Sequence, residues 1–374
     1  MKLLNGIKVV DVSRLLPGGF CSMILAELGA DVIKVEEPGI GDYMRLAPPL
    51  VDDVSFFHST VNKNKRSIAV GLKKNEGKKI LEKLIINADI FIEGFRPGVM
   101  KKLGFDFETV SKLNRRIIYC SISSFGQLHN MSRLPGHDLN FQAMSGVFTT
   151  SKVPKFPTVQ YADMVAGLYA AIGTLAALSS SRRRAIHIDV PIVQSLISLQ
   201  ILHLASYLSN VSTDFDGLLY GEEPYYKFYR TKDQKHIAIA AIEEKFRLNL
   251  LRILKAEDIM QLMNGSKEDR QKAERRLAAI IKMKTRDEWT SILMEKETCI
   301  TPVLDISEVL KYPWSREVYD AQRKVLIIPI KSRGEKKHAI KEAPSIGEDT
   351  DDILSSLGYS KREIMILKSK NVVQ

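Results

Sequence analysis

The beginning of the chain contains the pattern that most restricts the fold: a strand, a helix and a second strand in close succession. Residues 7–12 form an apolar, β-branched run, residues 20–28 are helical in composition and stop at Gly29, and residues 31–35 are again strand-like. Two strands joined through a helix pair in parallel with a right-handed crossover. The alternation continues in a helix at 78–87 and strands at 89–92 and 117–121. This pattern predicts an α/β protein with an open parallel sheet and helices on both faces.

A second, smaller domain is expected after residue 209, where the composition changes. Residues 210–223 are polar and contain glycine, as a linker would. Two strands follow at 225–229 and 236–241, and charged helices run from 243 to about 296, which indicates an α+β domain. Two short helices are expected between 342 and 374. A length of 374 residues is sufficient for two domains.

The first strand–helix turn argues against a dinucleotide-binding protein. Residues 13–20 read Ser-Arg-Leu-Leu-Pro-Gly-Gly-Phe and lack the Gly-x-Gly-x-x-Gly spacing that lets a backbone approach a pyrophosphate. Glu36 and Glu37 follow the second strand, where an acidic residue would bind a ribose, but without the glycine spacing they are interpreted as a surface feature at the strand end.

Composition and charge exclude several other classes. The net charge of +11 comes from basic residues spread along the chain, in short runs such as 182–184 and 336–337, without a helix-turn-helix or zinc pattern. We therefore expect no nucleic-acid partner, although part of the charge suits a phosphate-bearing ligand. The apolar runs 165–178 and 193–208 are interrupted and fall short of the roughly 20 residues of a membrane span. The three cysteines are far apart, no signal peptide is apparent, and a reduced, cytoplasmic protein is expected.

Two residues that can carry a proton lie at the starts of two expected helices. His137 stands in Gly136-His137-Asp138-Leu139-Asn140, and Asp163 stands before the Ala- and Gly-rich run 165–178. A neutral imidazole and a carboxylate at such places could share one substrate carbon, one removing a proton and the other returning it. The alternative is structural, because Asp is a favoured helix cap and a single His is usually a hydrogen-bonded polar group. The six other histidines lack the spacing of metal ligands, so no metal site is expected.

Ordered motifs along the whole chain resemble one family. They are residues 4–11 (LNGIKVVD), 26–36 (AELGADVIKVE), 62–68 (NKNKRSI), 95–99 (FRPGV) with 103–104, 124–126 (SFG), 187–190 (HIDV), 343–350 (APSIGEDT) and 357–359 (LGY). On these residues the chain resembles the class III CoA-transferase superfamily, CaiB/BaiF type, which includes the α-methylacyl-CoA racemases.

The resemblance implies a particular architecture. Members are interlaced homodimers, in which a Rossmann-like large domain is built from both ends of the chain and a small α+β domain from the middle. It implies a large domain from residues 1–209 and 330–374, and a small domain from 225–315. The active site lies between the large domain of one subunit and the small domain of the other. The substrate is an acyl-CoA thioester, so coenzyme A is part of the substrate and no metal or redox cofactor is needed.

The resemblance also assigns site residues. Transferases use the carboxylate matching Asp163 as a nucleophile, through an aspartyl-CoA thioester, whereas racemases pair that Asp with a His matching His137. Gly136, Asp138 and Asn140 belong to the same motif and are expected to contact the substrate.

The other matched positions concern the second domain and coenzyme A. A Glu matching Glu243 lines the racemase site, and Val70, Lys73 and Arg96 border the CoA channel. Two positions depart from racemases: residues 164–167 (Met-Val-Ala-Gly) are closer to transferases, and Glu37 stands where animal racemases have an arginine that contacts CoA.

These observations favour a racemase of 2-methyl-branched acyl-CoA thioesters that works through an enolate. The alternative is a CoA-transferase that moves CoA between carboxylic acids, and a third possibility is a basic nucleotide-binding or scaffold protein without enzymatic activity. Backbone N–H groups at the start of the helix near Met164 are expected to stabilise the enolate oxygen. As a helix-capping carboxylate, Asp163 is expected to have a lowered pKa, which makes it a poor proton donor until substrate closes the site.

Overall fold

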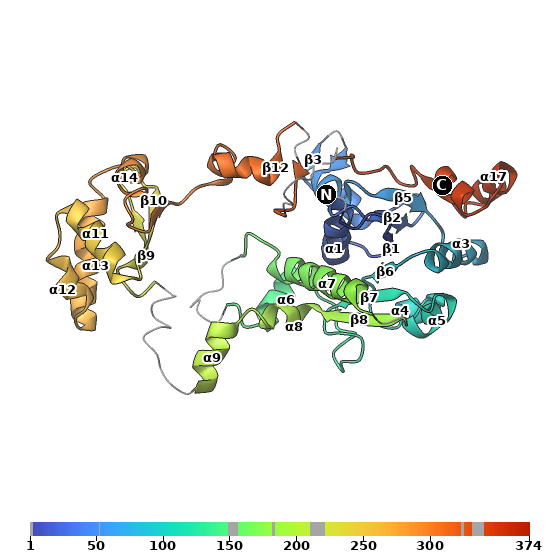
Figure 1. Cartoon of the computed structure of the whole chain (residues 1–374), viewed down its shortest axis with the longest axis horizontal. Helices are drawn as coiled ribbons and strands as arrows, with labels where there is room; N and C mark the ends of the chain where they lie inside the picture. The colour runs from blue at the N-terminus through green and yellow to red at the C-terminus, as the bar shows by residue number, and fades with distance from the viewer. Residues whose placement is uncertain are drawn as a thin grey trace. The chain divides into compact units, whose positions relative to one another are not determined.

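The chain folds into two units that contain different kinds of sheet. The computed structural model describes residues 3–51, 53–148, 156–181, 184–209, 221–322, 325–330 and 340–374. Unit 1 comprises Met1–Gln200 and Arg316–Gln374, and unit 2 comprises Ile201–Ser315 (Figure 1). Most of the expected linker (210–220 of 210–223) and the basic pairs 182–183 and 336–337 lie outside the described residues.

Unit 1 is organised around a six-stranded parallel sheet, which confirms the α/β prediction. Its strands, in spatial order, are β5 (Arg66–Ala69), β2 (Asp31–Glu36), β1 (Lys8–Asp11), β6 (Ile90–Glu93), β7 (Ile118–Ser123) and β8 (Ile186–Pro191). Numbered along the chain within this sheet, the order is 3-2-1-4-5-6, as in the Rossmann fold, and the order reverses between β1 and β6. Ligands of such sheets bind outside the carboxyl ends of the strands at this point.

Both faces of the sheet are covered because successive strand residues point to opposite sides. Val9 belongs to the core under α1 (Leu16–Glu27) and α7 (Tyr161–Ser179), whereas Val10 belongs to the core under the helices of the other face. Those helices are α3 (Asn75–Ile86), α5 (Phe107–Leu113), α16 (Thr350–Ser356) and α17 (Lys361–Ser369).

The segment that follows unit 2 in the sequence returns to the sheet of unit 1. Val373 forms an antiparallel bridge with Val70, which follows β5, and Asp349 Oδ2 accepts a hydrogen bond from the Ser67 N–H at 2.8 Å. Unit 1 is therefore built from segments that lie on both sides of unit 2 in the sequence.

Helix α1 begins at Leu16, earlier than the expected start at residue 20. Pro17 explains the difference, because a proline fits the first turn of a helix, where its missing N–H is not needed. The remaining elements of unit 1 are η1 (Tyr43–Leu46), β3 (Leu50–Val51), β4 (Val54–Ser55), α2 (Phe56–Asn62), α4 (Val99–Leu103), α6 (Asp138–Met144), α8 (Ile192–Ile197), β12 (Tyr319–Asp320) and β13 (Val325–Leu326). The short helix η2 (Pro313–Glu317) lies at the boundary of the two units.

Unit 2 has an antiparallel sheet with helices packed on it. The sheet has the order β11 (Ile300–Pro302), β10 (His236–Ala240) and β9 (Tyr226–Arg230). Its helices are α9 (Ile201–Ser209), α11 (Glu244–Leu254), α12 (Ile259–Met263), α13 (Lys267–Ile281), α14 (Arg286–Leu293) and α15 (Ile306–Val309). Apolar side chains of α11 to α14 pack with Tyr229, Ile237, Ile239 and Ile300 of the three strands in one core.

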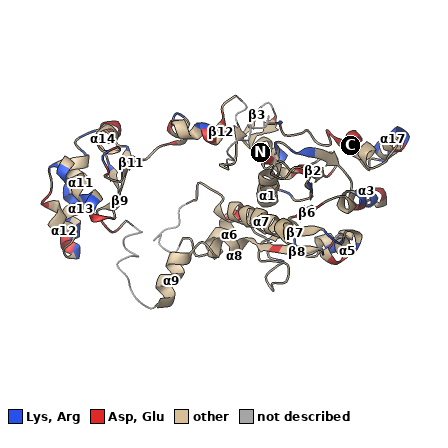
Figure 2. Ribbon diagram, in the orientation of Figure 1, with Lys and Arg blue, Asp and Glu red and all other residues tan. Residues whose placement is uncertain are grey.

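Charge is distributed unevenly over the helices. Figure 2 shows Lys, Arg, Asp and Glu on α3, α5, α17 and the helices of unit 2, and almost none on α7, α8 and α9. By length and composition alone, α7 could cross a membrane. The expectation that no apolar segment approaches the length of a membrane span is therefore wrong for this helix. The inner face of α7 is nevertheless part of a protein core, because Ala162, Ala166 and Ala170 are buried against α1 and the sheet.

The packing of α1 on α7 depends on Gly167, and this gives a testable prediction. A Cβ at Gly167 would lie 2.8 Å from the Pro17 carbonyl oxygen, a backbone atom, whereas a Cβ at Gly173 would meet only the Ile188 side chain. Gly167→Ala is therefore expected to lower the free energy of unfolding by about 1–3 kcal/mol, despite the better helix propensity of alanine. Gly173→Ala, in the same helix, is the control and should cost less, because its Cβ would lie 2.9 Å from a side-chain atom, Ile188 Cγ2, which can move more easily than a backbone carbonyl. Urea unfolding measures both, and equal effects would contradict the close approach.

Candidate active site

Helices α6 and α7 begin near each other at the carboxyl edge of the parallel sheet. Both lie between β7 and β8 in the chain, so α7 returns antiparallel to the strands and its first turn lies at the edge where they end. This is the edge at which open α/β sheets bind their ligands. His137 and Asp163, the two proton carriers expected from the sequence, stand at these helix starts.

The buried carboxylate of Asp138 joins the two helix starts. Its Oδ1 accepts hydrogen bonds from the N–H groups of Ala162 (2.9 Å) and Asp163 (3.2 Å), and its Oδ2 accepts one from Gln142 Nε2 (2.5 Å). An acidic group at a helix N-terminus satisfies unpaired amides and is stabilised by the helix dipole. Because Asp138 follows His137 directly, these bonds bring the backbone of His137 to the first turn of α7.

His137 is the residue immediately before α6, and its side chain is exposed. Asn140 holds its backbone, because Asn140 Oδ1 accepts a hydrogen bond from the His137 N–H at 3.1 Å. Gly136 is required for the same turn, since a Cβ there would lie 2.6 Å from the buried ring of Phe141. Three residues of the expected motif thus set the position of His137, and their contact with substrate stays a prediction.

Asp163 differs from expectation in position and in charge. It is the third residue of α7 and not its cap, which is Gln160. Burial and the neighbouring negative charge of Asp138 raise the pKa of the Asp163 carboxyl to about 7. The expected lowered pKa is therefore wrong, because burial and the charge of Asp138 both disfavour the ionised carboxyl. A carboxyl with this pKa is partly protonated near neutral pH and can donate a proton.

The first-turn amides of α7 all have acceptors within the protein. The Tyr161 N–H donates to the Val159 carbonyl (2.9 Å), the Ala162 and Asp163 N–H groups donate to Asp138, and the Met164 N–H donates to the Gln160 carbonyl (3.0 Å). None of these amides is therefore unpaired in this structure, and the hypothesis that one of them stabilises an enolate oxygen requires the substrate oxygen to displace an acceptor.

The residues expected to border the CoA channel follow two different strands. Lys73 and Val70 come after β5, and Arg96 comes after β6, three strand spacings or about 14 Å away along the same edge. Lys73 and Arg96 are exposed, whereas the Val70 side chain is packed in the core. A ligand that touches both ends of this row must be extended.

Glu37, at a position where the resemblance implies an arginine, lies between two cations. Arg14 Nη2 is 2.9 Å from its Oε2, and Lys73 Nζ is 3.4 Å from its Oε1. Partial burial alone would raise the pKa of Glu37, but the Arg14 hydrogen bond and the Lys73 charge lower it. The guanidinium of Arg14 also lies over the rings of Tyr43 and Phe95. Glu37 thus pairs with two positively charged side chains, Arg14 and Lys73, at this edge of the sheet.

Arg14 and Glu93 are candidate site residues that the sequence did not reveal. Glu93 ends β6, is buried, and accepts a hydrogen bond from the Phe95 N–H at 2.8 Å, which orients the loop that carries Arg96. Burial raises the pKa of Glu93 to about 7. For Glu93, the sequence offered one indication of a functional role, a charged residue at the end of the apolar strand 90–93.

Glu243 belongs to unit 2, where it is exposed and directly precedes α11. Its place in the site stays a prediction. No group of three His, Cys, Asp or Glu side chains that could hold a metal ion occurs in the described part of the chain.

Comparison with known proteins decides the family. The model of CoA-transferase family III matches residues 4–350. The chain belongs to CoA-transferase family III. It is 31% identical to alpha-methylacyl-CoA racemase of Mus musculus, over 100% of this chain and 98% of the relative. It is 32% identical to succinyl-CoA:glutarate CoA-transferase of Mus musculus, over 71% of this chain and 67% of the relative.

A solved structure supports the fold of this family III protein. The chain is similar to a CAIB/BAIF family protein from Brucella suis, with a TM-score of 0.83 and 26% identity over 95% of this chain and 99% of the other. These matches confirm the resemblance to CaiB/BaiF-type class III CoA-transferases that the sequence motifs indicated. The protein therefore belongs to an enzyme family. Relatives of both the racemase and the transferase type match, so the choice between these activities depends on the chemistry of the site.

The link between Asp138 and Asp163 can be tested by titration. Asp138→Asn removes a negative charge but keeps an acceptor oxygen for the α7 amides, so the pKa of Asp163 is expected to fall below about 7 while burial keeps it above its ordinary value. Carbon-13 NMR of labelled aspartates, assigned with Asp163→Asn, measures the change. Asp351→Asn, an exposed charge on α16, is the control. An unchanged Asp163 titration in Asp138→Asn would mean that burial alone sets its pKa.

Proposed function

We propose that this protein is an α-methylacyl-CoA racemase-like isomerase, which interconverts the two epimers of 2-methyl-branched acyl-CoA thioesters. The observation that carries the proposal is the raised pKa of Asp163, about 7, beside the helix start that bears His137. A carboxyl that is partly protonated at neutral pH can return a proton that an imidazole base has removed, which suits reversible proton exchange at one carbon.

In the proposed reaction the α-carbon of the thioester lies between the two groups. The neutral His137 imidazole takes the α-proton, and the electron pair of the broken C–H bond moves onto the thioester as an enolate. The protonated Asp163 carboxyl then gives its proton to the opposite face of the same carbon. The products are the other epimer, an imidazolium and a carboxylate, and the reverse reaction starts from that state.

The enolate oxygen needs a hydrogen-bond donor, since charge accumulates there in the transition state. The Asp163 N–H has the longest bond of the four first-turn amides of α7, 3.2 Å to Asp138 Oδ1. It is the amide that a substrate oxygen would displace most readily, and we assign it this role.

The CoA part of the substrate is proposed to lie along the carboxyl edge of the sheet. Its phosphate groups need cations, and the exposed Lys73 and Arg96 and the half-buried Arg14 supply them along this edge. No metal or redox cofactor takes part in the proposed reaction.

A homodimer is part of the proposal. Helix α9 has no buried residue, and Ile201, Tyr207 and Leu208 are 69–79% exposed. Such an apolar helix is typical of a surface that another chain covers. In the interlaced arrangement that the family resemblance implies, the partner subunit's Glu243 would line the site at Asp163.

The alternative is a CoA-transferase in which the ionised Asp163 carboxylate attacks the acyl group and then carries CoA as a thioester. The sequence after Asp163 and the transferase relatives favour it. It requires a second carboxylic acid as substrate and shows ping-pong kinetics, whereas the racemase acts on one substrate.

Proton exchange distinguishes the two activities. His137→Ala is expected to lower the rate of α-deuterium incorporation into a (2R)- or (2S)-2-methylacyl-CoA in D2O at least 100-fold, because the base is removed. Mass spectrometry and chiral analysis follow the product, and His236→Ala, an exposed histidine on β10, is the control. Exchange that persists in His137→Ala, or CoA transfer without any exchange in the unmodified protein, would contradict the racemase.

The proposed CoA position gives a separate prediction. Lys73→Ala is expected to weaken CoA binding about 3- to 10-fold and to reduce its dependence on salt, because a cation near phosphate is lost. Calorimetric titration at two salt concentrations measures this. Lys74→Ala is the matched control, since Lys74 Nζ is hydrogen-bonded to the Lys370 carbonyl. Equal affinities for the two variants would place the phosphates elsewhere.

A further inference from the structure

The turn that connects β1 to α1 contains a backbone conformation that leucine rarely adopts. Leu15 has φ 63° and ψ −157°, a region populated almost entirely by glycine. Residues are kept in such conformations only where the surrounding structure imposes them, and they are concentrated at active sites and ligand-binding segments. The turn lies at the carboxyl end of β1, where the order of the sheet reverses.

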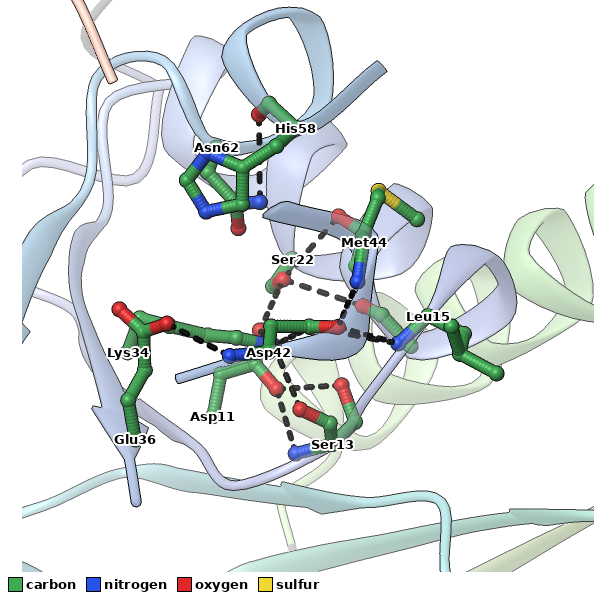
Figure 3. Close-up of polar contacts among 12 residues, drawn as sticks. Asp11, Ser13, Leu15, Ser22, Lys34, Glu36, Asp42, Met44, His58 and Asn62 are labelled. Atoms are coloured by element: carbon green, nitrogen blue, oxygen red, sulfur yellow. Dashed lines mark hydrogen bonds and ion pairs between the residues drawn. The ribbon is translucent and has the colours of Figure 1, made fainter. Parts of the chain in front are cut away.

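Buried charged side chains hold both sides of Leu15 (Figure 3). The Leu15 N–H donates to both carboxylate oxygens of Asp42, at 3.0 and 3.2 Å. Lys34 Nζ donates to the Ser13 carbonyl at 2.5 Å, and Asp11 Oδ1 accepts from the Ser13 N–H at 2.9 Å. The two ends of the turn are therefore fixed by side chains from β1, β2 and the segment before η1.

Lys34 and Asp42 each stabilise the charged form of the other. Lys34 Nζ lies 3.1 Å from Asp42 Oδ2, and both residues are at most 2% exposed. Burial alone would raise the pKa of Asp42, but the charge of Lys34 and the amides of Met44 and Leu15 lower it to about 2. Burial alone would lower the pKa of Lys34, but the charges of Asp11, Asp42 and Glu36 raise it. Both groups stay ionised across the physiological range.

The turn leads directly to the helix that carries Asp163. Two residues after Leu15, the Pro17 carbonyl oxygen lies against Gly167 of α7, so closely that no Cβ could be added there. Gly167 and Asp163 are four residues apart on one helix and therefore lie on the same face, one turn from each other. Any shift of the Leu15 turn is passed through Pro17 to the helix face that bears the reacting carboxyl.

We propose that Asp42 and Lys34 are positioning residues for the chemistry at Asp163, which they support by holding Leu15 in its positive-φ conformation. The buried ion pair fixes the Leu15 turn, the turn fixes Pro17 against α7, and this contact sets the surroundings of the Asp163 carboxyl. The inference rests on the proposed function only in taking Asp163 as the reacting group. It applies equally to proton exchange and to acyl transfer.

A double-mutant cycle separates this role from ordinary support of the fold. Asp42→Asn is expected to lower the turnover number at least 10-fold, because the Leu15 turn relaxes. In the Leu15→Gly background the same substitution should cost less than about threefold, because glycine adopts the turn without strain. Loss of a buried ion pair alone predicts the same cost in both backgrounds.

Glu27→Gln is the matched control. It breaks another buried ion pair of unit 1, Lys63 Nζ to Glu27 Oε1 at 2.6 Å, at the far end of α1 from Leu15. Its effect on turnover and on melting temperature should be the same with and without Leu15→Gly. If Asp42→Asn does not fold, Lys34→Gln takes its place in the same cycle, because it breaks the ion pair but leaves a donor near the Ser13 carbonyl.

The titration of Asp163 by carbon-13 NMR gives a readout that does not depend on activity. We expect its pKa to move in Asp42→Asn and to return toward about 7 in the double variant. Equal losses of turnover in both backgrounds, with an unmoved Asp163 titration, would overturn the proposal. If the unmodified protein shows neither exchange nor transfer, the proposed function fails, and the titration alone then decides whether Asp42 positions Asp163.

Discussion

The hydrogen bonds from the first turn of α7 to Asp138 are the interaction on which the candidate site depends. They place the short helix α6, and with it the His137 backbone, against the start of α7. The same carboxylate sets the electrostatics, because its negative charge adds to burial in raising the pKa of Asp163. One side chain therefore links the two helix starts and also contributes, after burial, to the raised pKa of Asp163.

The sequence predicted the parallel sheet because local patterns determine it. The β-branched runs, the helix stop at Gly29 and the strand that follows agree with one another, and β1, α1 and β2 follow from them. The pKa of Asp163 could not be predicted in this way. Asp138 is 25 residues away in sequence, and nothing in its immediate neighbourhood shows that it accepts the amides of α7. For the same reason the sequence suggested unpaired amides at α7, whereas the fold had already supplied their acceptors.

The two departures from the racemase pattern, at Glu37 and in the stretch that contains Gly167, have different physical explanations. Glu37 stands where the family resemblance implies an arginine, yet Arg14 and Lys73 both pair with it, so other residues supply positive charge at this edge of the sheet. Gly167, in the stretch that is closer to transferases, is required by the approach of the Pro17 carbonyl, whichever reaction the site performs. The first departure concerns ligand binding and the second concerns packing, so only chemistry at His137 and Asp163 distinguishes the two activities.

The insertion of unit 2 between the two parts of unit 1 affects the order in which the protein is made. Residues 340–374 supply α16, α17 and the Val373 bridge to Val70, and a ribosome adds them only after all of unit 2. During synthesis, therefore, the β5 side of the sheet and one of its apolar faces lack the cover of α16 and α17 until after unit 2 has been synthesised. A nascent chain of this topology has a period in which its larger half is exposed to aggregation and to binding by chaperones.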